Sequence, residues 1–152
     1  MKHSPAIAAI LSVLASPGLA GDPEKGATAF NQCQTCHVVI DADGNTIAGR
    51  NARTGPNLYA VIGRQAGTVE GFRYGASLVQ AGEKGLVWDE EQLAEYLQDP
   101  QGFLRAYLGD NRARSQMSHR VRNADQASDI AAFLASVSPQ GDDEEDEEEA
   151  TD

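Results

Sequence analysis

Cysteine is scarce in this sequence, and the scarcity weakens several structural explanations of the two cysteines that it contains. Of 152 residues only Cys33 and Cys36 are cysteines, so no other cysteine could help them complete a zinc site. A disulfide between residues so close together would constrain little of the unfolded chain. A redox-active dithiol usually follows a strand of a βαβ pattern, and no such pattern surrounds this pair. The zinc, disulfide and dithiol alternatives stay open, but each lacks the sequence context that it needs.

Long hydrophobic runs are also lacking. The most apolar stretch, residues 6–14, is too short for a typical membrane span, although an uncleaved N-terminal anchor is an alternative. Basic Lys2 precedes this stretch and small residues ending at Ala20 follow it, which is typical of a signal peptide cleaved after Ala20. We therefore expect a signal peptide over 1–20, one domain over 21–139 and a tail over 140–152, with no membrane-spanning segment in the mature protein.

Basic residues are few, 12 Lys and Arg against 23 Asp and Glu, for a net charge of −11. Much of the imbalance lies at the C-terminus, where nine of the acidic residues fall within 142–152. Such a composition predicts a disordered, solvated tail. Residues 21–141 carry 11 basic and 14 acidic side chains and are only mildly acidic. A molecule with this charge is not expected to bind nucleic acid.

The two cysteines belong to the motif Cys33-Gln34-Thr35-Cys36-His37. A Cys-x-x-Cys-His sequence is typical of covalent haem attachment. Cys33 and Cys36 are predicted to form thioethers with the two haem vinyl groups, and His37 is predicted to be the proximal iron ligand. The predicted cofactor is one covalent haem c, which would add to the limited core of a short chain. Haem is attached outside the cytoplasm by the usual bacterial route, so the motif and the signal peptide together predict a periplasmic protein.

The sixth iron ligand has two candidates. Beyond the predicted signal peptide the chain has one methionine, Met117, and one further histidine, His119. The neighbours of Met117 in residues 115–120 are polar, so no apolar periodicity explains a methionine there. Ligation by Met117 would raise the reduction potential, whereas ligation by His119 would lower it. A displaceable sixth ligand would instead suit a gas-binding or peroxidase-like protein, but the sequence offers no distal acid–base pair.

Several later segments resemble signatures of the class I c-type cytochromes, in particular the bacterial cytochrome c2 and c550 group. The segments are Thr54-Gly55-Pro56-Asn57-Leu58, Gly63-Arg64, Gly71-Phe72-Arg73-Tyr74-Gly75, Tyr96-Leu97-Gln98-Asp99-Pro100 and Met117. The resemblance covers nearly all of residues 21–139. It implies an all-α fold in which N- and C-terminal helices cross around the haem.

The resemblance also implies roles for five residues. The Pro56 carbonyl would orient the His37 ring by accepting from its second nitrogen. Arg64, Tyr74 and Trp88 would donate to the haem propionates, which are costly to bury uncompensated. For the two aromatic residues, a plain core role is the alternative. Tyr96 would lie near the methionine sulfur.

Three helices are expected from capping and periodicity. Asp22 and Pro23 begin one over about 23–31, Asp89 begins a second that ends before Pro100, and Asn123 begins the last. Residues 101–116 are expected to be a connection longer than its counterpart in mitochondrial cytochrome c. The second helix should bury Leu93, Tyr96 and Leu97, and the last should pack its stripe of Ile130, Phe133, Leu134 and Val137 across the first near Gly26 and Phe30.

Five arginines lie in residues 105–122, which we call the arginine segment: Arg105, Arg112, Arg114, Arg120 and Arg122. If Met117 faces the iron, these side chains should ring the exposed haem edge and steer the protein toward acidic docking sites. Solvated arginines or internal ion pairs are the alternative. The resemblance implies a monomeric single-electron carrier, not an enzyme. Its implied partners are the cytochrome bc1 complex and either a terminal oxidase or a photosynthetic reaction centre.

Overall fold

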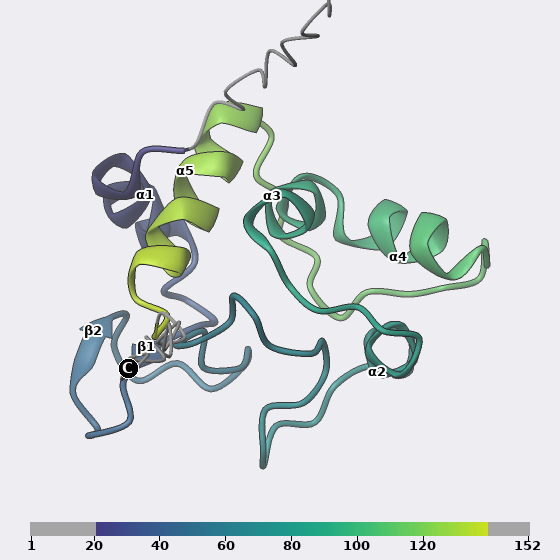
Figure 1. Cartoon of the computed structure of the whole chain (residues 1–152), viewed down its shortest axis with the longest axis horizontal. Helices are drawn as coiled ribbons and strands as arrows, with labels where there is room; N and C mark the ends of the chain where they lie inside the picture. The colour runs from purple at the N-terminus through teal and green to yellow at the C-terminus, as the bar shows by residue number, and fades with distance from the viewer. Residues whose placement is uncertain (1–20, 140–152) are drawn as a thin grey trace, which may run out of the picture.

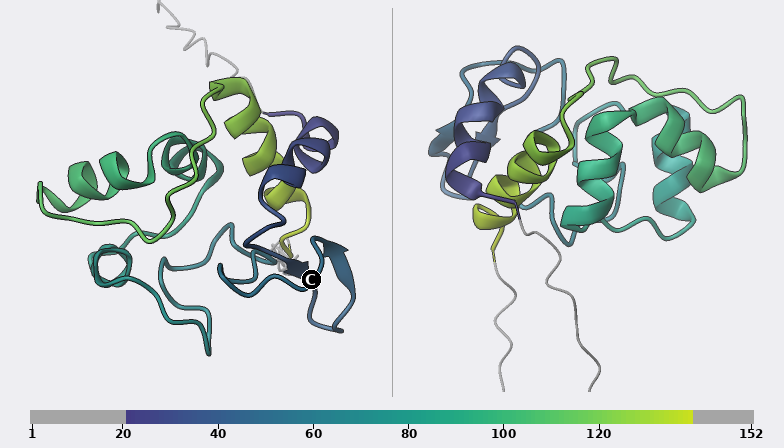
Figure 2. Two further views of the ribbon diagram at one scale, coloured as in Figure 1. Left: turned by 180° about the vertical axis from the view of Figure 1, so that it is seen from behind. Right: turned by 90° about the horizontal axis from the view of Figure 1, so that it is seen from above.

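A computed structural model describes residues 21–139; the predicted signal peptide and acidic tail lie outside the described residues. The order of elements is α1 (Pro23–Ala29), η1 (Phe30–Gln32, a 3₁₀ turn), β1 (Val39–Ile40), β2 (Thr46–Ala48), α2 (Ala76–Glu83), α3 (Glu90–Gln98), α4 (Pro100–Leu108) and α5 (Ala124–Ser136). Helices α1 and α5 cross on one side of the molecule, and α2, α3 and α4 form the other side (Figure 1). The views in Figure 2 show the same division. Within 21–139, no helix has the length and apolar character needed to cross a membrane.

Helix α1 begins where the sequence predicts. The Asp22 carboxylate accepts hydrogen bonds from the backbone N–H of Glu24 at 3.0 Å and Lys25 at 3.1 Å, and Pro23 takes the first helical position. The α-helix ends at Ala29, earlier than expected, because the chain tightens into η1. Such a turn uses i to i+3 bonds, as from the Cys33 N–H to the Phe30 carbonyl at 2.8 Å. This turn leads directly into the Cys-x-x-Cys-His motif.

The crossing of α1 and α5 depends on Gly26 and Phe30, as predicted. A Cβ at Gly26 would meet the Asp129 carbonyl and would lie 2.8 Å from the Phe133 Cβ. The Phe30 ring is fully buried and packs on that of Phe133, with centroids 5.5 Å apart. The Asp22 N–H adds a hydrogen bond of 2.7 Å to the Asp129 carboxylate. The first and last helices therefore meet with almost no space between their backbones.

Replacing Gly26 tests this contact. Gly26→Ala would ordinarily favour a helix, but here the new methyl group collides with α5. We expect the free energy of unfolding to fall by about 1–3 kcal/mol, measured by denaturant titration of the holoprotein. Ala27→Leu, which adds a larger side chain on the exposed face of the same helix, should leave stability nearly unchanged. Equal stability of Gly26→Ala and wild type would contradict this account of the crossing.

Helix α3 forms as predicted, whereas α4 shows that the expectation of a simple connection over residues 101–116 was wrong. Asp89 caps α3 by accepting from the Gln92 N–H at 2.7 Å, and the expected inner face is buried. Residues 101–116, however, are not simply a connection, because α4 occupies their first half. Asp99 caps this helix through the Gly102 N–H, Pro100 takes its first position, and Gly109 ends it in a left-handed conformation. The pair Asp99-Pro100 thus both follows one helix and begins the next.

Two short elements were not predicted, namely α2 and the β1–β2 hairpin. In the hairpin, Val39 pairs with Ala48 and Ile40 with Thr46, and the connecting turn is closed by the Asp41 carboxylate. The fold is therefore helical, as expected, apart from this small antiparallel sheet.

Candidate haem site

A cavity of about 320 Å³ lies between the loops that follow the motif and the inner faces of α3 and α5. Most of its wall is apolar, with side chains that include Leu58, Val61, Leu93, Leu97 and Ile130. Every residue predicted to bind the haem, ligate its iron or orient a ligand lines this one cavity: Cys33, Cys36, His37, Pro56, Arg64, Tyr74, Trp88, Tyr96 and Met117. The fold thus brings together segments that are up to 84 positions apart in the chain.

His37 is held in the orientation that an iron ligand needs. Its Nδ1 lies 3.0 Å from the Pro56 carbonyl oxygen, which can only accept, so Nδ1–H donates and the Nε2 lone pair stays available. Burial lowers the pKa of His37, although the Pro56 bond opposes the shift, and a lowered pKa favours the neutral ring that binds metal. A Cβ at Gly55 would lie 2.6 Å from Nδ1 and 2.8 Å from Nε2. The glycine therefore lets the backbone lie against the imidazole ring.

The cysteines differ in their surroundings. Cys33 is buried, whereas Cys36 is exposed. Burial, with a smaller contribution from Cys36, raises the pKa of the Cys33 thiol to about 11. A redox-active dithiol needs a thiol of lowered pKa, because the thiolate is the nucleophile. Cys33 therefore lacks the lowered pKa that the attacking thiol of a redox-active dithiol needs.

Met117 lies in the cavity wall and is held from its N-terminal side by Ser115. The Met117 N–H donates to the Ser115 Oγ at 3.1 Å, and that hydroxyl lies 3.2 Å from the Tyr96 hydroxyl on α3. Burial raises the pKa of Tyr96, which keeps its phenol protonated and able to donate. The role of Ser115 was not predicted, because its only signal in the sequence is a small hydroxyl residue two positions before the predicted ligand.

The predicted propionate donors have mixed surroundings. The Arg64 guanidinium already donates to the carbonyls of Tyr59 at 2.9 Å and Asn57 at 3.3 Å, and further N–H groups remain for another acceptor. Trp88 is buried and packs edge-on against Tyr96, with ring centroids 5.1 Å apart, as the core alternative expects. Tyr74 packs edge-on against Phe72 at 4.7 Å. All three also line the cavity, so their role toward the propionates stays a prediction.

These residues fit a haem. The cavity offers apolar walls for a flat macrocycle, a pre-oriented imidazole, a thioether and donors toward carboxylates. No protein-family model matches the chain. Individual relatives, in contrast, match it over most of their length. Cytochrome c2 of Rhodovulum adriaticum is 59% identical over 119 residues, which are 78% of this chain and 94% of that protein. The chain belongs to the class I c-type cytochromes.

Other comparisons agree with this membership. Cytochrome c-551 of Roseobacter denitrificans is 50% identical over 91% of this chain and 97% of its own length. The crystal structure of cytochrome c2 from Rhodobacter sphaeroides matches with a TM-score of 0.75 and 55% identity, over 77% of this chain and 96% of that one. The predicted class I cytochrome c fold is confirmed, and the cytochrome carries one covalent haem c that serves electron transport.

The arginine segment of this cytochrome is partly neutralised. Arg112 pairs with Asp110 at 3.3 Å, and Arg120 pairs with Asp99 at 2.9 Å, so the ion-pair alternative holds for these two. Within residues 21–139, no carboxylate lies at ion-pair distance from Arg105, Arg114 or Arg122. Arg114 is exposed and lies at the haem cavity.

Proposed function

We propose that this cytochrome is a monomeric periplasmic carrier that takes single electrons from the cytochrome bc1 complex and delivers them to a terminal oxidase or a photosynthetic reaction centre. In this proposal it carries electrons and catalyses no reaction. The observation that supports it best is the joint placement of His37 and Met117 on one apolar cavity, with the His37 ring already fixed by Pro56.

Each part of the chain has a proposed task in this function. Cys33 and Cys36 hold the haem covalently, and His37 and Met117 ligate its iron, which supplies the one-electron couple. The apolar wall excludes water, while the bond from the Met117 N–H to Ser115 and the bond between Ser115 and Tyr96 limit the movement of the Met117 backbone. Because little then has to rearrange, electron transfer needs only a brief encounter with a partner.

The arginine segment is the proposed surface for that encounter. Arg114 supports this role best, since it is exposed, lies at the cavity and is not paired with a carboxylate among the described residues. A positive charge there attracts an acidic docking site and raises the association rate without demanding tight binding. The acidic tail over 140–152 and the signal peptide over 1–20 remain predictions of the sequence.

Charge reversal tests the docking surface. Arg114→Glu is expected to slow second-order reduction by purified cytochrome bc1 complex roughly three- to tenfold at low ionic strength, and the difference should fade as salt is added. Arg50→Glu makes the same change in net charge outside the arginine segment and should slow the reaction much less. Equal rates for the two variants would overturn the proposed surface, and failure of wild type to accept electrons from the complex would overturn the proposed donor.

A further inference from the structure

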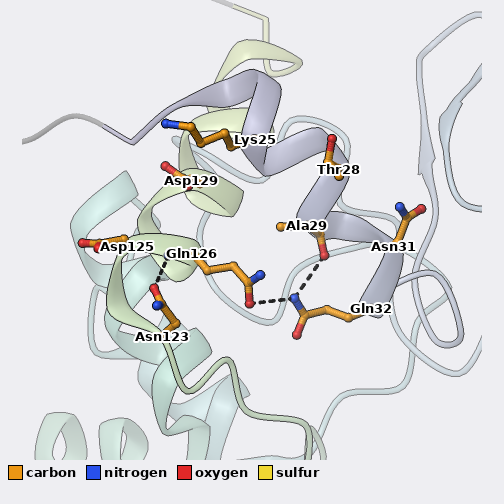
Figure 3. Close-up of a pocket in the computed structure, with 9 residues that line it drawn as sticks. All are labelled: Lys25, Thr28, Ala29, Asn31, Gln32, Asn123, Asp125, Gln126 and Asp129. Atoms are coloured by element: carbon orange, nitrogen blue, oxygen red, sulfur yellow. Dashed lines mark hydrogen bonds between the residues drawn. The ribbon is translucent and has the colours of Figure 1, made fainter.

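Gln32 lies between two hollows of the molecule. One is the haem cavity, and the other is an open groove of about 620 Å³ between α1 and α5 (Figure 3). The Gln32 side chain comes from the last residue of η1, directly before Cys33. Figure 3 shows its amide reaching from this turn toward Gln126 on α5. The residue thus sits where the haem-binding motif meets the pair of crossing helices.

Three hydrogen bonds engage the Gln32 amide. Its nitrogen lies 3.1 Å from the Ala29 carbonyl and 3.1 Å from the Gln126 Oε1, and its oxygen lies 2.9 Å from the His119 Nε2. The Ala29 carbonyl can only accept, so the amide nitrogen must face it. The amide oxygen therefore faces His119, and the imidazole donates through its Nε2–H. Both amide protons and the oxygen are used, and the chain of bonds runs from His119 through Gln32 to Gln126.

This chain of bonds joins parts of the protein that are far apart in sequence. His119 is 87 positions from Gln32, and Gln126 is 94 positions from it. We call residues 115–119 the Met117 segment. Ser115 lies two positions before Met117 in this segment, and His119 lies two positions after Met117. The Ser115 side ties the segment to Tyr96 on α3, whereas the His119 side ties it to η1 and α5. Hydrogen bonds of neighbouring side chains on both sides of Met117 therefore lead to different parts of the fold, α3 on one side and η1 with α5 on the other.

We propose that Gln32 is a positioning residue that fastens the Met117 segment to the crossed helices and so keeps the sulfur at the iron. The inference rests on the proposed ligation by Met117. Without the Gln32 amide, the His119 side of the segment loses its link to η1 and α5, while the Ser115 link remains. The segment then moves away from the iron more often, and an added ligand binds during those openings.

The test measures how fast imidazole replaces the sixth ligand in the ferric holoprotein. The replacement is monitored through the loss of the thioether-to-iron charge-transfer absorption. Gln32→Leu is expected to react between two- and fivefold faster than wild type, as the loss of a partly exposed hydrogen bond implies. His119→Leu should react as fast as Gln32→Leu. Because His119 is exposed, this second variant keeps the test possible if Gln32→Leu folds poorly. His119→Gln keeps a donor at nearly the same place and should restore the wild-type rate.

Gln98→Leu is the matched control, since within residues 21–139 the Gln98 amide bonds only to the Ala94 carbonyl of its own helix. It should react at the wild-type rate. Thermal unfolding of each variant separates a local opening of the segment from a general loss of stability. If wild type has the charge-transfer band but Gln32→Leu and His119→Leu react at the wild-type rate, the role of Gln32 is overturned while ligation by Met117 stands. If wild type lacks the band, the proposed ligation fails, and this inference fails with it.

Discussion

Met117→Ala is expected to open the iron to added ligands and to lower the reduction potential by on the order of 0.1 V or more. A thioether ligand favours ferrous iron, so its loss stabilises the ferric state. The apolar wall and the His37–Pro56 bond are untouched by this change, so the haem should stay attached. The potential is measured by redox titration of the purified holoprotein, and ligand access is measured by carbon monoxide binding to its reduced form.

His119→Gln distinguishes the two candidate sixth ligands. It removes the imidazole but keeps a hydrogen-bond donor toward Gln32. If Met117 is the ligand, this variant keeps a closed iron and a potential close to that of wild type. If His119 is the ligand, the iron opens in His119→Gln and stays closed in Met117→Ala, which would contradict the account.

Gly55→Val is expected to reduce the yield of holoprotein strongly and to lower the free energy of unfolding by about 3 kcal/mol or more. Any Cβ at this position would overlap the His37 ring, and a branched side chain adds further atoms against it. The ring would have to turn, which would break its bond to the Pro56 carbonyl and misdirect Nε2. Haem content per protein and denaturant unfolding of the surviving holoprotein measure the effect.

A size series at the same position serves as the control. Gly55→Ala should lower the free energy of unfolding by about 1–3 kcal/mol, less than Gly55→Val, because the overlap grows with the side chain. Wild-type haem content and stability in Gly55→Val would show that the backbone does not lie against the imidazole as described.

The parts of this cytochrome that could be predicted from sequence are those determined by a few neighbouring residues or by a regular period. The haem motif needs only five consecutive residues, and the caps Asp22, Asp89 and Asn123 each act within three residues of their own position. The stripe on α5 has the helical period and marks its buried face. The resemblance to a known family then supplied the roles of residues that no local pattern explains, such as Pro56 and Arg64.

Other features were not predicted, for identifiable reasons. Helix α4 was missed because Asp99-Pro100 was interpreted only as the end of α3, although the same pair of residue types correctly marked the start of α1. The contact of Ser115 with Tyr96 and the bonds of Gln32 with His119 and Gln126 join residues 19 to 94 positions apart. Such contacts leave no periodicity in the chain, and only the folded structure brings the partners together.

The visible absorption spectrum of the reduced, exported protein, recorded before and after addition of carbon monoxide, tests the central claim most directly. The predicted spectrum is that of a covalently bound c-type haem that carbon monoxide leaves unchanged, because ligation of the iron by both His37 and Met117 would leave no site for the gas. A rapid shift with carbon monoxide in the wild-type protein would contradict a closed electron carrier and favour ligand-binding or catalytic chemistry. The absence of any haem absorption would contradict the account at its foundation, the attachment of haem to Cys33 and Cys36.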